Sequence, residues 1–266
     1  MTAPIFEVHD VTYRYHEVTA LEGLSLAIMP GQRIALLGAN GSGKSTLLNL
    51  LDGLCFPEKG SITFQGEPLT EDRLRGQIEF EFRTRVGLVF QNPDVQLFNP
   101  TVFDEIAFGP LQLQWPKEQI LRSVTEILEQ MGIAHLRDRP PHRLSTGEKK
   151  RVALASVLIL DPEVLLLDEP TAALDPKSES QMIDFLVGCS GGLKTVVTAT
   201  HDLDLVEDIA DYCHVFQRGR IVAGGAPSEI LNDHALLLSS NLIHAHRHAH
   251  ASGEFHSHPH RHGHGH

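Results

Sequence analysis

A glycine-rich stretch is the first place where residue types point to chemistry. GANGSGKST, Gly38 to Thr46, holds three glycines, one lysine and two neighbouring hydroxyls. Its spacing, Gly-x4-Gly-Lys-Ser, fits a phosphate-binding loop. Glycines let backbone N–H groups curl toward one centre, and a following helix directs its positive end there. Lys44 can then reach the β- and γ-phosphates of a nucleotide, while the Ser45 hydroxyl can sit on Mg²⁺. The expected nucleotide-binding residues are Gly38, Ala39, Asn40, Gly41, Ser42, Gly43, Lys44, Ser45 and Thr46.

An apolar stretch that ends in carboxylates supplies the second part of this chemistry. EVLLLDEP, Glu163 to Pro170, is typical of a buried strand that delivers Asp168 and Glu169 at its end, where ligands collect in open α/β sheets. Asp168 would help to hold Mg²⁺ through its water shell. Glu169 could polarise the attacking water. An acidic turn leaving the core is the alternative for this octapeptide alone.

The elements around these residues indicate an α/β fold. Apolar or alternating stretches predict strands, and leucines at helical spacing predict a helix directly after the glycine loop. Strands that alternate with helices favour a mostly parallel sheet covered on its faces. A helical stretch, residues 98–155, interrupts the alternation, and its segment 116–133 places Ile120, Val124, Ile127, Leu128 and Met131 on one face. The expected strands cover residues 5–15, 21–32, 33–38, 61–66, 85–93, 163–170 and 195–201, with a late hairpin over 212–225 that turns at Arg218-Gly219.

Further motifs give the chain a family resemblance. LSTGEKKR, Leu144 to Arg151, resembles the LSGGQ signature of ATP-binding cassette (ABC) ATPases and stands shortly before the acidic strand, as in that family. Gln91 resembles the Q-loop glutamine, TAALD (residues 171–175) the D-loop, and His201 the switch histidine. Tyr15 is similar to the aromatic residue that stacks on adenine, with Tyr13 as a weaker candidate. The motifs keep the family's order from about Ile5 to Leu231.

The resemblance implies a P-loop ATPase fold with a mostly parallel core sheet, an N-terminal antiparallel β subdomain and a helical subdomain. It implies a head-to-tail dimer, homo- or heteromeric, that sandwiches two ATP molecules. Thr146 replaces a glycine and Glu148 a glutamine, so a β-branched residue and a negative charge enter the signature. The implied catalytic residues are Glu169, His201 and Gln91, the Mg²⁺ ligands Ser45, Gln91 and Asp168, and the contacts to the partner's ATP Ser145, Gly147, Glu148 and Asp175.

The segment after Gln91 narrows the resemblance. VFQNPDVQLF followed by TVFDEIAFGP resembles the ATPase subunits of energy-coupling-factor importers, and the cobalt and nickel branch most of all. In that group this segment docks a helix of the integral membrane subunit, which implies Asp94, Phe98, Phe103 and Glu105 as the docking surface. The expected function is therefore that of an ATP-hydrolysing subunit that powers a membrane importer of nickel or cobalt ions. The alternatives are an energy-coupling-factor ATPase for vitamins or other micronutrients, a soluble non-transport ABC ATPase, and a metal store in which the cassette is only a scaffold.

Histidines crowd the end of the chain. We expect an ATPase domain over residues 1–240 and a disordered, low-complexity tail over 241–266. Imidazoles at alternate positions share a face in an extended chain, so neighbours can chelate one ion such as Ni²⁺, Co²⁺ or Zn²⁺. A passive solvated tail or an expression tag is the alternative. The candidate ligands are His244, His246, His248, His250, His256, His258, His260, His262, His264 and His266.

Composition limits the remaining function classes. The chain has 266 residues and a formal net charge of -12, which argues against a broad nucleic-acid footprint. Its three cysteines, at 55, 189 and 213, form no metal-binding spacing. No apolar run is long enough to span a bilayer. We therefore expect a soluble or peripheral protein, and the resemblance to importer ATPases implies a place at the cytoplasmic face of the cell membrane.

Overall fold

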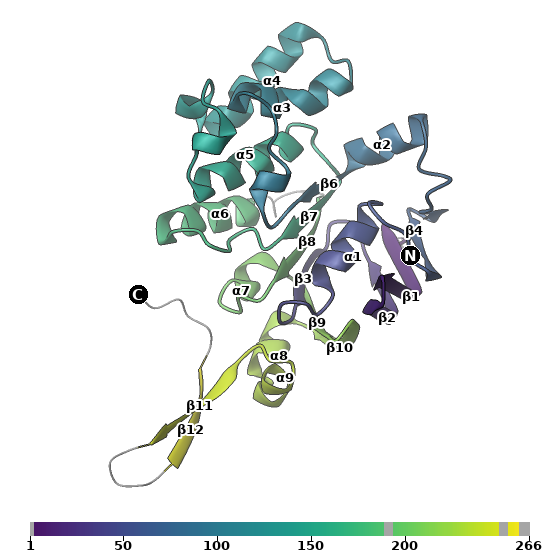
Figure 1. Ribbon diagram of the computed structural model, residues 1–266, viewed down its shortest axis with the longest axis vertical. Coiled ribbons are helices and arrows are strands. Elements are labelled where there is room, and N and C mark those ends of the chain that lie inside the picture. The colour runs from purple at the N-terminus through teal and green to yellow at the C-terminus, as the bar shows by residue number, and fades with distance from the viewer. Residues whose placement is uncertain (1–2, 189–193, 250–254, 261–266) are drawn as a thin grey trace. The chain divides into compact units, whose positions relative to one another are not determined.

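The computed structural model describes residues 3–188, 194–249 and 255–260, with only the backbone of the last two strands (Figure 1). The chain forms two compact units. The first combines Met1–Thr70 with Thr198–His266, and the second is Glu71–Val197. The helical stretch expected over residues 98–155 lies wholly inside the second unit.

The first unit opens with an antiparallel sheet whose three longer strands each bury apolar side chains. Phe6 lies opposite Ile28 on one neighbouring strand and opposite Phe64 on the other, and all three are buried. The antiparallel pairing of these strands confirms the expected antiparallel subdomain. Its strands, in the order β2-β1-β4-β5, are β1 (Phe6–Tyr15), β2 (Val18–Ile28), β4 (Lys59–Phe64) and β5 (Glu67–Pro68).

The first unit also carries the strand that leads into the glycine loop. β3 (Arg33–Leu37) is buried after its first residue and pairs in parallel with β9 (Tyr212–Gln217), which pairs antiparallel with β10 (Arg220–Gly225). The turn between β9 and β10 places Arg218 at φ 49° and Gly219 at φ 77°, a pair of values that two-residue hairpins favour. The helices of this unit are α1 (Lys44–Leu51), α7 (Val206–Ile209), α8 (Pro227–Asn232) and α9 (His234–Ser239).

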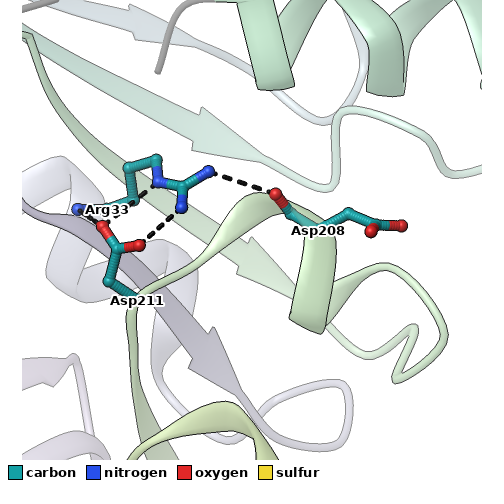
Figure 2. A network of polar contacts seen from close by, with 3 residues as sticks. All are labelled: Arg33, Asp208 and Asp211. Carbon is teal, nitrogen blue, oxygen red and sulfur yellow. Dashed lines mark hydrogen bonds and ion pairs between the residues drawn. The ribbon is translucent and has the colours of Figure 1, made fainter. Parts of the chain in front are cut away.

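One arginine joins the starts of β3 and β9 (Figure 2). The Arg33 guanidinium donates to both carboxylate oxygens of Asp211, at 2.5 and 3.1 Å, and to the carbonyl oxygen of Asp208 at 3.1 Å. This two-pronged geometry is the strong form of an arginine–carboxylate pair. The Arg33 hydrogen bond holds the pKa of the Asp211 carboxyl below its usual range. The pair therefore fixes the two parallel strands at the end opposite the glycine loop.

The second unit combines parallel strands with helices. β6 (Val86–Val89) pairs in parallel with β7 (Val164–Asp168), β8 (Thr195–Thr200) is the next strand in the order, and the chain crosses between the units within β8. Every residue of β7 is buried, as expected for an internal parallel strand. The helices are α2 (Gln77–Arg85), α3 (Val102–Gln112), α4 (Lys117–Gln130), α5 (Thr146–Leu158) and α6 (Pro176–Gly188), with short 3-10 turns η1 (Pro93–Val95), η2 (Ala134–Leu136) and η3 (Pro141–Arg143).

The helical stretch of the second unit packs as its periodicity predicts. α3 lies against both α4 and α5. The apolar face expected on α4 is buried at all five positions from Ile120 to Met131. Within the described ranges, no helix has both the length and the apolar character that crossing a bilayer requires.

The histidine-rich segment is described only in its backbone. β11 (His244–Ala249) and β12 (Phe255–His260) pair antiparallel, with His244 opposite His260 and His248 opposite His256. This segment belongs to the tail for which the sequence predicts disorder. Its remaining residues, 250–254 and 261–266, lie outside the described part of the chain.

Candidate functional site

The glycine loop between β3 and α1 is shaped by close backbone contacts. A Cβ at Gly38 would lie 2.5 Å from Ser42 Oγ and 2.7 Å from the carbonyl oxygen of Phe216. Gly43 has φ 111°, and a Cβ there would lie 2.8 Å from the carbonyl oxygen of Ala20. Both glycines are therefore required by space, and Gly43 also by its backbone conformation.

Two neighbouring segments of the first unit anchor this loop. The carbonyl oxygen of Ser42 accepts from Gly219 N at 2.9 Å, and the carbonyl oxygen of Gly219 accepts from Glu22 N at 3.0 Å. The turn of the β9–β10 hairpin thus joins the loop to β2. The Ser42 hydroxyl is buried and, among the described residues, has no hydrogen-bond partner.

Lys44 lies at the start of α1 and points back over the loop. Its ammonium is buried and donates to the carbonyl oxygens of Gly38, at 2.6 Å, and Ala39, at 3.4 Å. Gly43 occupies the N-cap position of α1 and has no side chain to cap the first turn. A cation, a positive helix end and a buried hydroxyl thus meet in a cradle without bulk, which fits a triphosphate chelated to Mg²⁺.

The first unit also holds the aromatic and histidine candidates. Tyr15 ends β1 with 45% of its surface exposed, and its ring meets that of Tyr13 edge-on at 4.9 Å. Tyr13 is less exposed than Tyr15, and burial and the neighbouring Cys55 raise the pKa of Tyr13 to about 12. Tyr15 is therefore the better placed of the two to stack on a base. His201 follows β8 and is half-buried.

The two carboxylates expected after the acidic strand lie in the second unit. Asp168 is the last residue of β7, and Glu169 follows it, 3% exposed. Glu169 has φ 48°, a left-handed conformation that costs a non-glycine residue about 1–3 kcal/mol and clusters at functional sites. Lys150 of α5 donates to the carbonyl oxygens of Glu169 and Pro170 at 2.7 and 3.3 Å.

The signature segment begins α5 through a reciprocal cap. Ser145 Oγ accepts from Glu148 N at 3.3 Å, while the Glu148 carboxylate accepts from Ser145 N at 2.8 Å and from its hydroxyl at 2.9 Å. These bonds, the one from Ser145 N first, hold the pKa of Glu148 below its usual value. The capping box therefore gives the Glu148 carboxylate a local structural role. Thr146 is the exposed first residue of α5.

The D-loop aspartate and the signature glycine lie close together. Asp175 accepts from the backbone N–H of Lys177 and Ser178 at 3.2 and 3.1 Å, and from the Ser178 hydroxyl at 2.6 Å. A Cβ at Gly147 would lie 2.8 Å from that same Ser178 oxygen. The start of α5 and the start of α6 are thus packed too closely for a side chain at position 147.

Gln96, which the sequence alone did not single out, connects the segment after β6 to α5 through hydrogen bonds. Gln91 is exposed and lies two residues after the end of β6. Gln96 accepts from Phe90 N at 3.2 Å and donates to the carbonyl oxygen of Ala153 at 2.8 Å. Gln96 also donates to the Ser156 hydroxyl at 3.3 Å. No spacing rule marks Gln96, because its two partners on α5 lie 57 and 60 residues away in the sequence.

The surface expected to dock a membrane subunit needs one correction. Glu105 is 4% exposed, and its carboxylate accepts from Phe98 N at 2.8 Å and Asn99 N at 2.7 Å. The expectation that Glu105 belongs to that surface is wrong, because the carboxylate is buried against the loop it holds. Phe98 is 68% exposed and Asp94 is exposed while paired with Lys149 at 2.6 Å. Phe103 is half-buried beneath Arg137, whose guanidinium carbon lies 4.5 Å from the ring centre.

Three groups of expected residues are thus placed. The glycine loop, Tyr15 and His201 belong to the first unit, and Gln91, Asp168, Glu169 and the signature and D-loop residues belong to the second. Of the histidine tail, His250, His262, His264 and His266 lie outside the described residues, and the rest are described in their backbone only. Among the described residues, no group of three or more His, Cys, Asp or Glu side chains could hold a metal ion.

Comparison with known proteins identifies the family. The family model described as "ABC transporter" matches residues 21–172. The chain is 55% identical over 244 residues to the nickel import ATP-binding protein NikO of Rhodobacter capsulatus, covering 90% of this chain and 96% of that protein. It is 42% identical over 239 residues to the energy-coupling factor transporter ATP-binding protein EcfA of Methanocaldococcus jannaschii, covering 90% and 85%.

A solved structure agrees with this assignment. The structure of cbiO1 from Clostridium perfringens, part of the ABC transporter complex cbiONQ, superimposes with a TM-score of 0.76 at 38% identity and covers 90% of this chain and 95% of that one. The expected α/β architecture of a P-loop ATPase is thereby confirmed. The chain belongs to the ABC transporter family, as an ATPase that binds ATP with Mg²⁺ and hydrolyses it.

Proposed function

We propose that the chain is the ATP-hydrolysing subunit that powers a membrane importer of nickel or cobalt ions. The observation that carries the ATPase part is the cradle formed by Gly38, Gly43 and Lys44, which leaves no room for side chains and places an ammonium over it. The similarity to a protein named as a nickel import ATP-binding protein, which covers 90% of this chain, supports nickel as the transported ion.

The residues of the first unit would bind the nucleotide. Lys44 would exchange its contacts with the loop carbonyls for the β- and γ-phosphates, because charge-assisted hydrogen bonds to phosphate are the stronger ones. Ser45 would contribute its hydroxyl to Mg²⁺, and Tyr15 would stack on the base. The metal ion neutralises charge that develops on the phosphates. His201 would contact the γ-phosphate from the end of β8.

The residues of the second unit would carry out hydrolysis. Glu169 would accept a proton from the attacking water, and its buried position suits a general base. By the family resemblance, Asp168 and Gln91 would serve as ligands of Mg²⁺. ABC ATPases work as dimers, and in such a dimer Ser145, Gly147 and Glu148 would face the nucleotide of the partner subunit, with Asp175 at the same boundary. The start of α5 favours this role, because a helix N-terminus attracts an anion.

An exposed apolar group suits a membrane partner. Phe98 and Phe108 meet edge-on with ring centres 5.0 Å apart, and Val95 and Leu111 are also exposed nearby in the sequence. Exposed apolar side chains that gather in this way mark interaction surfaces. We propose that Phe98, with Asp94 at its border, receives a helix of the integral membrane subunit, which keeps the chain at the cytoplasmic face.

The histidine tail is proposed to bind transition-metal ions. The paired register of β11 and β12 places three histidines of one strand opposite three of the other. Imidazole suits Ni²⁺, Co²⁺ and Zn²⁺. Truncation after Leu242 followed by nickel titration calorimetry tests this role, because unchanged stoichiometry would remove the tail from metal binding.

Transport in vesicles tests the proposal as a whole. The chain is co-purified with its membrane subunits and reconstituted, and ATP-dependent uptake of radioactive nickel and cobalt is compared between the wild type and Glu169→Gln. Uptake that requires ATP and is lost in the variant is the expected result. ATPase activity stimulated by a vitamin and not by either metal would favour the other energy-coupling-factor importers, to which the chain is also similar.

A further inference from the structure

Lys150 is a lysine in the interior of the second unit. Only 4% of its surface is exposed, although lysine is among the residues least often fully buried. It lies on the face of α5 that also buries Gly147, Leu154 and Leu158. A cation at such a position must have partners there, because an unpaired buried charge is strongly unfavourable.

The partners of Lys150 belong to the turn that carries Glu169. Its ammonium donates to the carbonyl oxygen of Glu169 at 2.7 Å and to that of Pro170 at 3.3 Å. Burial lowers the pKa of Lys150 to about 8, and the carboxylates of Glu169 and Asp168 act in the opposite direction. The lysine therefore interacts with this turn through its backbone carbonyls and through its charge.

The turn itself is held in an unfavourable conformation. Glu169 has φ 48°, and its carbonyl oxygen accepts from Ala172 N at 3.2 Å as well as from Lys150. A left-handed non-glycine residue persists only where its surroundings fix it. The direction of the Glu169 side chain depends on this backbone conformation, so whatever holds the carbonyl also orients the carboxylate.

The same helix begins with the signature segment. The capping box of Ser145 and Glu148 stands at the first turn of α5, and Lys150 follows within the next turn. We propose that Lys150 is a positioning residue that holds the Glu169 turn for hydrolysis and links it to the signature segment of the same chain. This inference rests on the proposed role of Glu169 as the water-activating group.

Substitution of Lys150 in the full-length chain separates positioning from plain stability. Lys150→Met keeps the length of the side chain but removes its donors. Lys194→Met is the matched control, because Lys194 is a partly exposed lysine paired with the exposed Asp161 at 2.5 Å. We expect Lys150→Met to lower kcat about 10- to 100-fold, the scale of a small misplacement of a catalytic group. ATP affinity, measured with a fluorescent nucleotide, should stay within about twofold, because the phosphate contacts are unchanged.

A conservative variant and a reference variant complete the test. Lys150→Gln keeps N–H donors and should recover part of the lost kcat, and it carries the test if Lys150→Met does not fold. Wild-type kcat in both folded variants would overturn the inference, as would a fall in kcat matched by an equal fall in ATP affinity. Glu169→Gln, measured alongside, distinguishes a failure of the proposed role of Glu169 from a failure of the proposed role of Lys150. Turnover retained in Glu169→Gln overturns the proposed role of Glu169 itself, whereas its loss together with normal turnover in the Lys150 variants overturns only the role of Lys150.

Discussion

Replacement of Gly43 by alanine probes the shape of the nucleotide loop. Gly43 has φ 111°, and an added Cβ would lie 2.8 Å from the carbonyl oxygen of Ala20 and 2.8 Å from Leu21 Cδ2. The carbonyl belongs to β2 and cannot rotate away as a flexible side chain would. The loop must therefore move, or β2 must.

A substitution at a second glycine separates the free-energy cost of a left-handed backbone from the cost of overpacking. Gly66, in the turn between β4 and β5, has φ 80°, and a Cβ there would meet no described atom within 4 Å. Gly66→Ala therefore carries only the cost of a left-handed backbone, about 1–2 kcal/mol. Gly43→Ala carries a similar cost plus that of overpacking, typically about 1–3 kcal/mol more.

Thermal unfolding and ATP titration measure both effects. At about 2–4 °C per kcal/mol for a chain of this size, Gly43→Ala should melt several degrees below Gly66→Ala. It should also bind ATP more weakly, because the loop N–H groups are displaced, while Gly66→Ala binds ATP normally. Equal melting temperatures for the two variants, together with unchanged ATP affinity, would refute the proposed packing of Gly43 against β2.

Four further substitutions test three other parts of the structure. Because Arg33 holds the pKa of Asp211 below its usual range, the pair stabilises the fold above the ordinary aspartate pKa and loses this as pH falls through the folded pKa. In urea unfolding, Asp211→Asn should therefore cost about 1 kcal/mol at pH 7, a value limited by the 51% exposure of the carboxylate. This cost should shrink as the pH falls below the ordinary aspartate pKa. Glu105→Ala should cost about 2 kcal/mol, because two backbone N–H groups lose their acceptor, and an unchanged unfolding midpoint would contradict that role. Glu148→Gln keeps an acceptor for Ser145 and should shift the melting temperature less than Ser145→Ala, which loses a cap of about 1 kcal/mol; the reverse order would show that the capping box does not hold α5.

The chemistry-bearing segments could be predicted because their signals are local. The glycine loop, the acidic strand and the turn at Arg218-Gly219 each follow from residue types within a few positions of one another. The buried face of α4 follows from its helical spacing in the same way. Local patterns therefore predicted which elements carry the candidate site.

The contacts that shape those segments could not be predicted, since their partners are distant in sequence. Gly38 needs its small size because of Phe216, and Gly43 because of Ala20. The burial of Glu105 depends on the path of the preceding loop, and the family resemblance therefore implied a surface role that this residue does not have. α2 gave no helical signal, because Ile78, Phe80 and Phe82 alternate with polar residues as in a strand.

The sequence pattern marks Lys150 as unusual but does not indicate its role. A lysine on the buried face of a helix, in line with Leu154 and Leu158, conflicts with the apolar pattern around it. The sequence alone does not identify its partner, because the Glu169 turn lies on another element. Such local conflicts are expected where function takes precedence over packing.

ATP binding by Lys44→Ala tests the central claim most directly, namely that this loop grips the triphosphate of the nucleotide. Equilibrium titration of the purified chain with ATP and Mg²⁺ is compared among the wild type, Lys44→Ala and Lys59→Ala, a lysine on the surface of β4. We predict a loss of affinity of about 10- to 100-fold for Lys44→Ala, the value of one hydrogen bond to a charged group, and none for Lys59→Ala. Wild-type affinity in folded Lys44→Ala would contradict the claim.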